Sequence, residues 1–213
     1  MIITHLGKQH FKIQQGDLIL AFNPVSKESK EKQNKYGADI VLISTNLSDF
    51  NGSENCEHGE RKPFIVNGPG EYEVHNIFIK GFGTFVDLPT DQQKKEKLNL
   101  QNTSYVLTVD NIRILFLGCF FGDLSPLHRE VIDEVDILFL PVSGSENILN
   151  AYDANKLATK LEPKIIIPMD YDEASLKIFL KETGQEQVKK IDKLTIKKKD
   201  IESMEGEVVI FSL

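Results

Sequence analysis

Short segments rich in β-branched and aromatic residues dominate the first half of the chain. Residues that favour turns separate them, so each segment predicts a β-strand. Asn67–Gly70 and Asp110–Asn111 predict tight turns between antiparallel strands. The predicted strands are Ile2–Leu6, His10–Gln14, Leu18–Phe22, Asp39–Ile43, Phe64–Val66, Tyr72–Val74, Ile77–Gly81, Ser104–Val109 and Ile112–Leu117.

The pattern changes in the second half, where helical spacing alternates with apolar segments. Pro126–Glu134 and Asp153–Leu161 predict helices, and each leads into an apolar strand, Asp136–Leu140 or Lys164–Pro168. Asp172–Glu182 predicts a third helix. Two short strands, at residues 194–196 and 208–211, close the chain.

Two of the predicted strands lack polar alternation. Val41–Ile43 and Ile137–Leu140 are apolar throughout, which is typical of strands buried on both faces. The sequence therefore predicts an α/β fold in which two sheets pack face to face and helices cover the outer faces.

Residues 87–99 (DLPTDQQKKEKLN) have almost no apolar content. A segment of this composition cannot bury enough surface to order itself, so it predicts a flexible loop between two β-rich halves. At about 150 residues per domain, 213 residues leave one or two domains open. We expect a single domain over residues 1–213.

The charge balance is acidic, with 25 Lys and Arg against 32 Asp and Glu. Only Arg61, Arg113 and Arg129 are arginines, and nucleic-acid contacts favour arginine on a positive face, so we expect no nucleic-acid partner. The longest apolar run, Ile114–Phe121, is far shorter than the roughly 18 residues that cross a bilayer. The start of the chain lacks a signal-peptide pattern. We therefore expect a cytoplasmic protein with no membrane partner.

Motifs spread over nearly the whole chain carry a resemblance to a known family. They are THLGKQHFKI, LAFNPVSK, STNLSDFN, GPGEYEV, VDILFLPVSG and LEPKIIIPMDY. Together they resemble the metallo-β-lactamase superfamily, and in particular its small Zn-dependent hydrolase-like branch that contains the ascorbate-phosphate lactonases. The resemblance implies an αββα four-layer sandwich of the metallo-β-lactamase type.

In that superfamily an H-x-H-x-D-H motif, two further histidines and a bridging aspartate hold one or two zinc ions, which activate water. This chain departs from the pattern: Thr45, Leu47, Phe50 and Phe116 stand at histidine positions. Leucine and phenylalanine carry no lone pair, so the resemblance implies that the dinuclear zinc centre is lost. Asn23 stands where the branch has a carboxylate that orients the ligands.

Three positions keep residues that can bind a metal. Asp49 matches the family aspartate, Cys119 stands at the bridging aspartate, and Asp170 stands at the last histidine. Together they are a tentative site for one divalent ion such as zinc. Alternatively, Cys119 is a small buried apolar residue and Asp49 caps loop backbone. Without a cation, three adjacent anions would repel one another. We therefore expect either that one carboxyl has a raised pKa or that a lysine side chain, with Lys8 as the candidate, is drawn toward the anions.

The remaining histidines and cysteines give weak signals. We expect His5 in the core and His10 in a surface role. Cys56 and His58 form a C-x-H pair on a polar segment, which we interpret as a surface loop. We expect both cysteines, Cys56 and Cys119, to be free thiols.

Two functions remain as hypotheses. In the first, the chain keeps a hydrolase fold but has lost zinc and catalysis, needs no cofactor, and acts as a binding or assembly module. Its partners would be an unidentified small molecule and a second copy of itself, in a homo-oligomer. In the alternative, it is a divergent enzyme that hydrolyses a phosphorylated or lactone-like small molecule with one metal ion.

Overall fold

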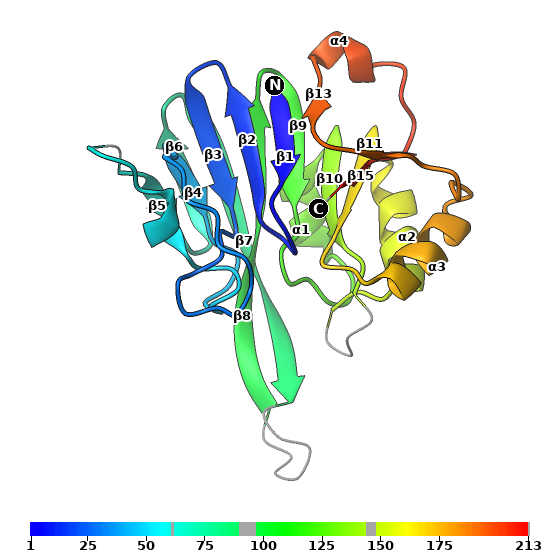
Figure 1. Cartoon of the computed structure of the whole chain (residues 1–213). Helices are drawn as coiled ribbons and strands as arrows, with labels where there is room; N and C mark the ends of the chain where they lie inside the picture. The colour runs from blue at the N-terminus through cyan, green and yellow to red at the C-terminus, as the bar shows by residue number, and fades with distance from the viewer. Residues whose placement is uncertain (61, 90–96, 144–147, 213) are drawn as a thin grey trace.

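Two large β-sheets pack face to face and three helices cover one of them, as Figure 1 shows for the computed structural model of the chain. The structure describes residues 1–60, 62–89, 97–143 and 148–212. The two-sheet sandwich predicted from the strand and helix order is confirmed.

The first sheet has six strands in the order β13-β1-β2-β3-β4-β5. Strands β1 to β3 form an antiparallel meander, and β4 and β5 extend it in parallel. Its members are β1 (Ile2–His5), β2 (Phe11–Gln15), β3 (Leu18–Phe22), β4 (Ile40–Leu42), β5 (Phe64–Val66) and β13 (Leu194–Thr195).

The second sheet has seven strands in the order β14-β11-β10-β9-β8-β7-β6. Strands β6 to β9 pair antiparallel, and β9, β10, β11 and β14 run parallel. Its members are β6 (Gly70–Val74), β7 (Ile77–Pro89), β8 (Lys97–Val109), β9 (Ile112–Phe116), β10 (Ile137–Pro141), β11 (Ile165–Met169) and β14 (Glu207–Val208).

The helices are η1 (Ser53–Cys56), α1 (Pro126–Ile132), α2 (Ala151–Leu161), α3 (Glu173–Glu182) and α4 (Lys198–Ile201), and β12 (Lys190–Ile191) pairs with β15 (Ile210–Phe211). The three predicted helices are confirmed within a few residues. The sequence missed η1, α4 and β12 because elements this short show too little periodicity. Among helices in the described ranges, none combines the length and apolar content needed to cross a bilayer.

The main core lies between the two sheets. Phe11, Phe22, Phe116 and Phe139 meet there, with ring centroids 4.8 Å apart for the pairs Phe22–Phe116 and Phe11–Phe139. A second core packs the other face of the second sheet against the helices. The apolar strand β10 is therefore buried on both faces, as predicted.

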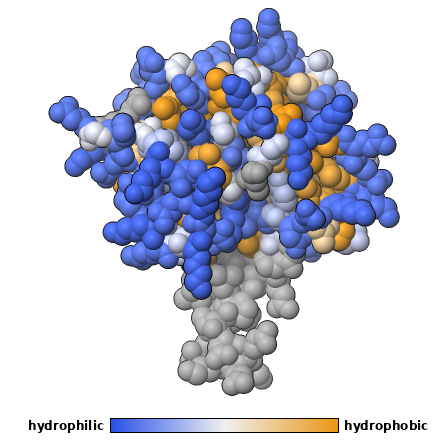
Figure 2. Space-filling view, viewed as in Figure 1, coloured by the Kyte–Doolittle hydropathy of each residue, from blue (hydrophilic) through white to orange (hydrophobic). Residues whose placement is uncertain are grey.

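The outer face of the first sheet is covered differently from the prediction of helices on both outer faces. Ala21 and Val41 on this face pack against Ala38, which lies just before β4, and against Cys56 in the short helix η1 after it. Small side chains on the strands allow these two segments to lie close to the sheet. Figure 2 shows hydrophilic residues over most of the face seen in Figure 1.

Strands β7 and β8 extend as a long hairpin from the lower edge of the sandwich in Figure 1. They pair as far as Pro89 and Lys97, so the ends of the predicted loop 87–99 are strand. The prediction failed at these ends because antiparallel backbone hydrogen bonds do not require apolar side chains. Residues 90–96 lie outside the described residues, and the flexibility of the segment stays a prediction.

Candidate functional site

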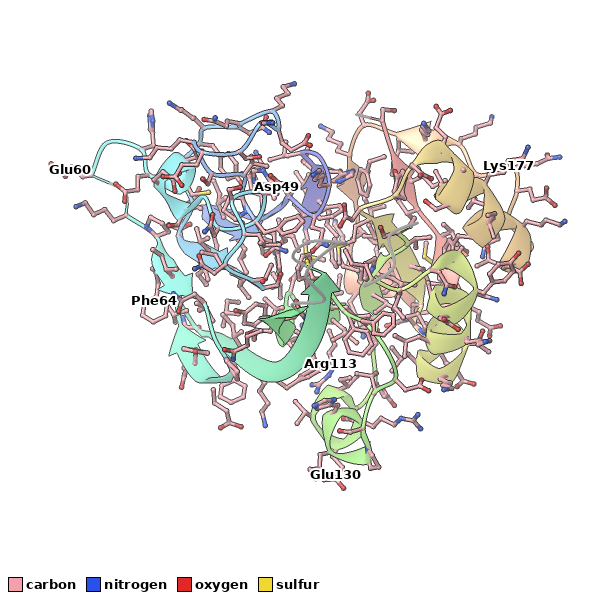
Figure 3. The ribbon with its side chains drawn as sticks, turned by 90° about the horizontal axis from the view of Figure 1, so that it is seen from below. Asp49, Glu60, Phe64, Arg113, Glu130 and Lys177 are labelled. Atoms are coloured by element: carbon pink, nitrogen blue, oxygen red, sulfur yellow. The ribbon has the colours of Figure 1, made fainter. Side chains whose placement is uncertain are left out.

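Several chain turns meet at the lower edge of the sandwich, the side that faces the viewer in Figure 3, where Asp49 is labelled. Lys8 lies in the β1–β2 turn, Asn23 follows β3, Gly118 follows β9 and Asp170 follows β11. Each has a left-handed backbone, with φ of 46°, 44°, 67° and 54° respectively. This conformation is costly for residues other than glycine and is common at functional sites. The edge is therefore the candidate site.

Lys8 forms an ion pair with Asp49. Its Nζ lies 2.6 Å from Oδ2 of Asp49 and 3.1 Å from Oε1 of Glu31. The Ser29 hydroxyl donates to the other carboxylate oxygen of Asp49. The prediction that a lysine is drawn toward these anions, with Lys8 as the candidate, is confirmed.

The pair shifts both pKa values toward the charged forms. Partial burial alone would raise the pKa of Asp49, but the hydrogen bonds from Lys8 and Ser29 and the Lys8 charge hold it below its ordinary value. Burial alone would lower the pKa of Lys8, but the bonds to Asp49 and Glu31 raise it above its ordinary value. Asp49 is thus a carboxylate whose counter-ion is an ammonium group of the chain itself.

Gln9 connects the other two predicted site residues. Its fully buried side chain donates through Nε2 to Oδ2 of Asp170 at 3.0 Å and to Sγ of Cys119 at 3.5 Å. Its Oε1 accepts a 2.9 Å hydrogen bond from Asn23. Asn23 in turn bonds both the backbone and the hydroxyl of Ser44, each at 2.8 Å. Amide side chains therefore bind these elements together where the family has metal ligands.

Cys119 and Asp170 lie in a setting that favours their neutral forms. Burial, reinforced by the nearby Asp170 charge, raises the pKa of the Cys119 thiol to about 12. Burial also raises the pKa of the Asp170 carboxyl, although the bond from Gln9 acts in the opposite direction. A zinc ligand must be deprotonated, so a protonated Cys119 is a poor one.

The remaining family positions hold side chains that are buried or partly buried and cannot provide a histidine ligand. Phe116 is fully buried between the sheets, and Phe50 is buried at the edge. Thr45 is also buried, and Leu47 is partly buried. In the described part of the chain, no group of three or more His, Cys, Asp and Glu is placed to hold a metal ion.

The donors in this arrangement do not fit a zinc ion. Lys8 already neutralises Asp49, and a Gln9 amide group points its hydrogens at both Cys119 and Asp170. A cation between these residues would meet positive charge and N–H hydrogens instead of lone pairs. The tentative single-ion site at Asp49, Cys119 and Asp170 stays a prediction, which metal analysis tests.

Two predictions about histidine and cysteine are wrong. His10, expected at the surface, is buried beside Tyr36, with its Nε2 2.9 Å from the phenol oxygen. Cys56, expected on a surface loop with His58, is also buried, whereas His58 is exposed. Tyr36 lies before β4 and Cys56 lies in η1 after it, and both segments fold over the sheet, a tertiary contact without a local sequence signal. His5 is in the core as expected, and both cysteines are free.

Replacing Gln9 by Leu tests the network. The change removes the Gln9 donor from the buried Asp170 carboxyl and the Gln9 acceptor from one of the two hydrogen bonds that the Asn23 amide nitrogen donates, so we expect a loss of about 1–3 kcal/mol in unfolding free energy. Urea unfolding at neutral pH measures it. Gln33→Leu, at an exposed position, is the control and should change stability little. Equal effects of the two variants would contradict the network.

Comparison with protein families identifies the fold. The family model described as the beta-lactamase superfamily domain matches residues 2–170. The chain belongs to the metallo-β-lactamase superfamily. A comparison with curated protein sequences returned no match.

Three solved structures share the fold of this chain. A protein of Thermotoga maritima assigned to its Zn-dependent hydrolases is 24% identical with a TM-score of 0.71, covering 99% of this chain and 97% of that one. A protein of Parabacteroides distasonis assigned as a metal-dependent hydrolase is 20% identical, with a TM-score of 0.60 and coverages of 85% and 89%. A metallo hydrolase of Ignicoccus hospitalis is 15% identical, with a TM-score of 0.59 and coverages of 92% and 99%.

Proposed function

We propose that this chain is a metal-independent member of the metallo-β-lactamase superfamily that binds a ligand without hydrolysing it. The observation that carries the proposal is the 2.6 Å ion pair between Lys8 and Asp49. Asp49 is the one carboxylate of the family motif that this chain retains, and the ion pair provides it with a counter-ion from the chain itself, the Lys8 ammonium group. Two free, buried cysteines suit a reducing, cytoplasmic location, as the sequence predicts.

The ion pair and the Gln9 network disfavour metal binding for a physical reason. A divalent ion would have to displace the Lys8 ammonium from Asp49 and turn the Gln9 amide away from Cys119 and Asp170. It would also have to remove the proton of a thiol whose pKa is raised to about 12. Each step costs free energy that a preformed site of histidine and carboxylate ligands does not require.

Among the residues that the structure describes, Cys119 lacks what a nucleophilic cysteine requires. An active cysteine needs a lowered pKa or a base in hydrogen-bond reach. The pKa of Cys119 is raised, and Gln9, whose amide cannot accept a proton, donates to its sulfur. Binding without hydrolysis therefore agrees best with this chemistry.

The alternative is a hydrolase of a phosphorylated or lactone-like small molecule that holds one zinc ion at Asp49, Cys119 and Asp170. It is supported by the assignment of the similar structures to metal-dependent hydrolases. In the structure, Cys119 and Asp170 do converge on one Gln9 nitrogen. A shared donor brings two of the three groups together, but Asp49 is paired elsewhere.

Metal analysis of the purified chain separates the two functions. After expression with zinc and manganese supplied and dialysis against metal-free buffer, we expect far less than stoichiometric metal, and no phosphodiesterase or lactonase activity. The matched variants are Cys119→Ala and Cys56→Ala, which each remove one buried cysteine. Tightly held metal that is lost in Cys119→Ala but kept in Cys56→Ala would establish the single-ion hydrolase instead.

A further inference from the structure

A cavity of about 460 Å³ lies beside the candidate site, between β4, β5 and β8. Side chains that line it include the hydroxyl and amide groups of Ser44, Thr45, Asn46, Asn51, Asn67 and Thr103. In the described part of the chain, no charged side chain lines it. Its size is in the range typical of small-molecule sites.

Thr45 gives the cavity a polar group without a partner. The residue is only 3% exposed, and its hydroxyl has no hydrogen-bond partner among the described residues. A buried unsatisfied hydroxyl destabilises a fold by about 1–3 kcal/mol. Such groups are rare in native proteins and call for a partner. The hydroxyl oxygen itself is buried, so a ligand would reach it through a rotation of the Thr45 side chain and would then supply the partner.

The walls of the cavity are held in place by hydrogen bonds to other elements. Ser44 is fixed on its side-chain and backbone atoms by Asn23, and its carbonyl accepts from the Thr103 amide at 2.7 Å. Asn51 donates at 2.7 Å to Asn46, a second residue of the wall. A ligand would therefore meet a largely preformed surface, which lowers the entropy cost of binding.

We propose that this cavity binds a small, uncharged, hydroxyl-rich ligand, of the neutral sugar or polyol class, through the Thr45 hydroxyl and the surrounding amides. Ligand hydroxyls both donate and accept, as do the hydroxyl and amide side chains opposite them. A charged ligand would lose hydration without meeting an opposite charge, so it is disfavoured. The inference rests on the proposed function, because it names the ligand of a chain that binds without metal.

Amide NMR spectra of the full chain in buffer with EDTA and without glycerol test the inference. The probes are D-glucose, D-ribose and xylitol, and their charged counterparts D-gluconate and D-glucose 6-phosphate. We expect at least one neutral probe to shift the amides of residues 44–46 and 103 saturably. We expect each charged counterpart to bind about tenfold more weakly or worse, because its charge is unpaired in the cavity.

Thr45→Val is the decisive variant, since it removes the hydroxyl and keeps the shape. It should weaken binding of the neutral probe about tenfold, the loss of one good hydrogen bond. Without ligand it should unfold at the same or a higher urea concentration than the wild type, because it removes an unsatisfied group. Thr159→Val, whose hydroxyl bonds to Asn155 on the exposed face of α2, is the control and should leave binding unchanged.

The outcomes separate this inference from the proposed function. If the chain stays metal-free and no neutral probe binds at these residues, or if Thr45→Val binds as tightly as the wild type, the inference is wrong and the proposed function stands. If probes bind only after zinc is added and EDTA removes them, the proposed function is wrong. Equal binding of charged and neutral probes would contradict the ligand class.

Discussion

Lowering the pH below about 6 is expected to destabilise the fold steeply, and replacing His10 should remove much of that loss. Burial, with the charge of nearby His5 as a second cause, lowers the pKa of His10 to about 3. In the unfolded chain the pKa is near 6.5, the ordinary value for histidine. A difference of this size corresponds to an upper limit of about 4–5 kcal/mol, at about 1.4 kcal/mol per pH unit.

The direction follows from proton binding. Between pH values of about 3 and about 6.5, the unfolded chain carries a proton on His10 that the folded chain does not carry. Stability is therefore complete above the unfolded pKa and is lost as the pH falls toward the folded pKa. The buried imidazole stays neutral because it lies against Tyr36, away from water.

Urea unfolding curves at a series of pH values from about 7 to about 4 measure this effect in the wild type and in His10→Gln. The two proteins are compared by how stability changes with pH, so a constant penalty of the substitution does not matter. His75→Gln, at an exposed position, is the matched control and should keep the wild-type slope. If the stability of His10→Gln falls with pH as steeply as that of the wild type, proton uptake by His10 on unfolding does not cause the loss.

The sequence could predict the sheets and helices because their signals are local. Strands such as Leu18–Phe22 and Phe64–Val66 are found at the predicted residues, and the Asp110–Asn111 turn has the positive φ values of a tight hairpin turn. Burial of β10 on both faces followed from its unbroken apolar sequence. These features depend on neighbouring residues alone.

The candidate site was only partly predictable. The family motifs place several potential anions close together, and their mutual repulsion predicts that a nearby lysine is drawn in. This reasoning needs only residue types and motif positions, and it pointed correctly to Lys8. Gln9 gave no signal, since a single glutamine in a turn belongs to no motif, and its contacts with Asn23, Cys119 and Asp170 span up to 161 positions along the chain. The burial of His10 likewise depends on a distant segment that folds over it.

Substituting Gly118 by Ala is expected to give the other large effect. Gly118 has φ of +67°, and an added Cβ would lie 2.5 Å from Oδ1 of Asn102 and 2.5 Å from the Ser44 Cβ. The left-handed backbone costs about 1–2 kcal/mol and the crowding about 1–3 kcal/mol, so we expect a loss of about 2–5 kcal/mol in unfolding free energy. Urea unfolding at neutral pH measures it.

Gly122→Ala separates crowding from backbone strain, because Gly122 also has a positive φ, of +86°, but no described atom lies within 4 Å of the place its added methyl group would take. It should lose only the backbone contribution, about 1–2 kcal/mol.

The close approach at Gly118 also lets the backbone amide of Cys119 donate to Asn102 at 2.8 Å. A methyl group at position 118 would collide with Ser44, which lines the cavity. Gly118→Ala should therefore weaken binding of the neutral ligand as well, whereas Gly122→Ala should not. Equal losses in the two variants would mean that the edge can relax around a methyl group, contrary to a preformed site.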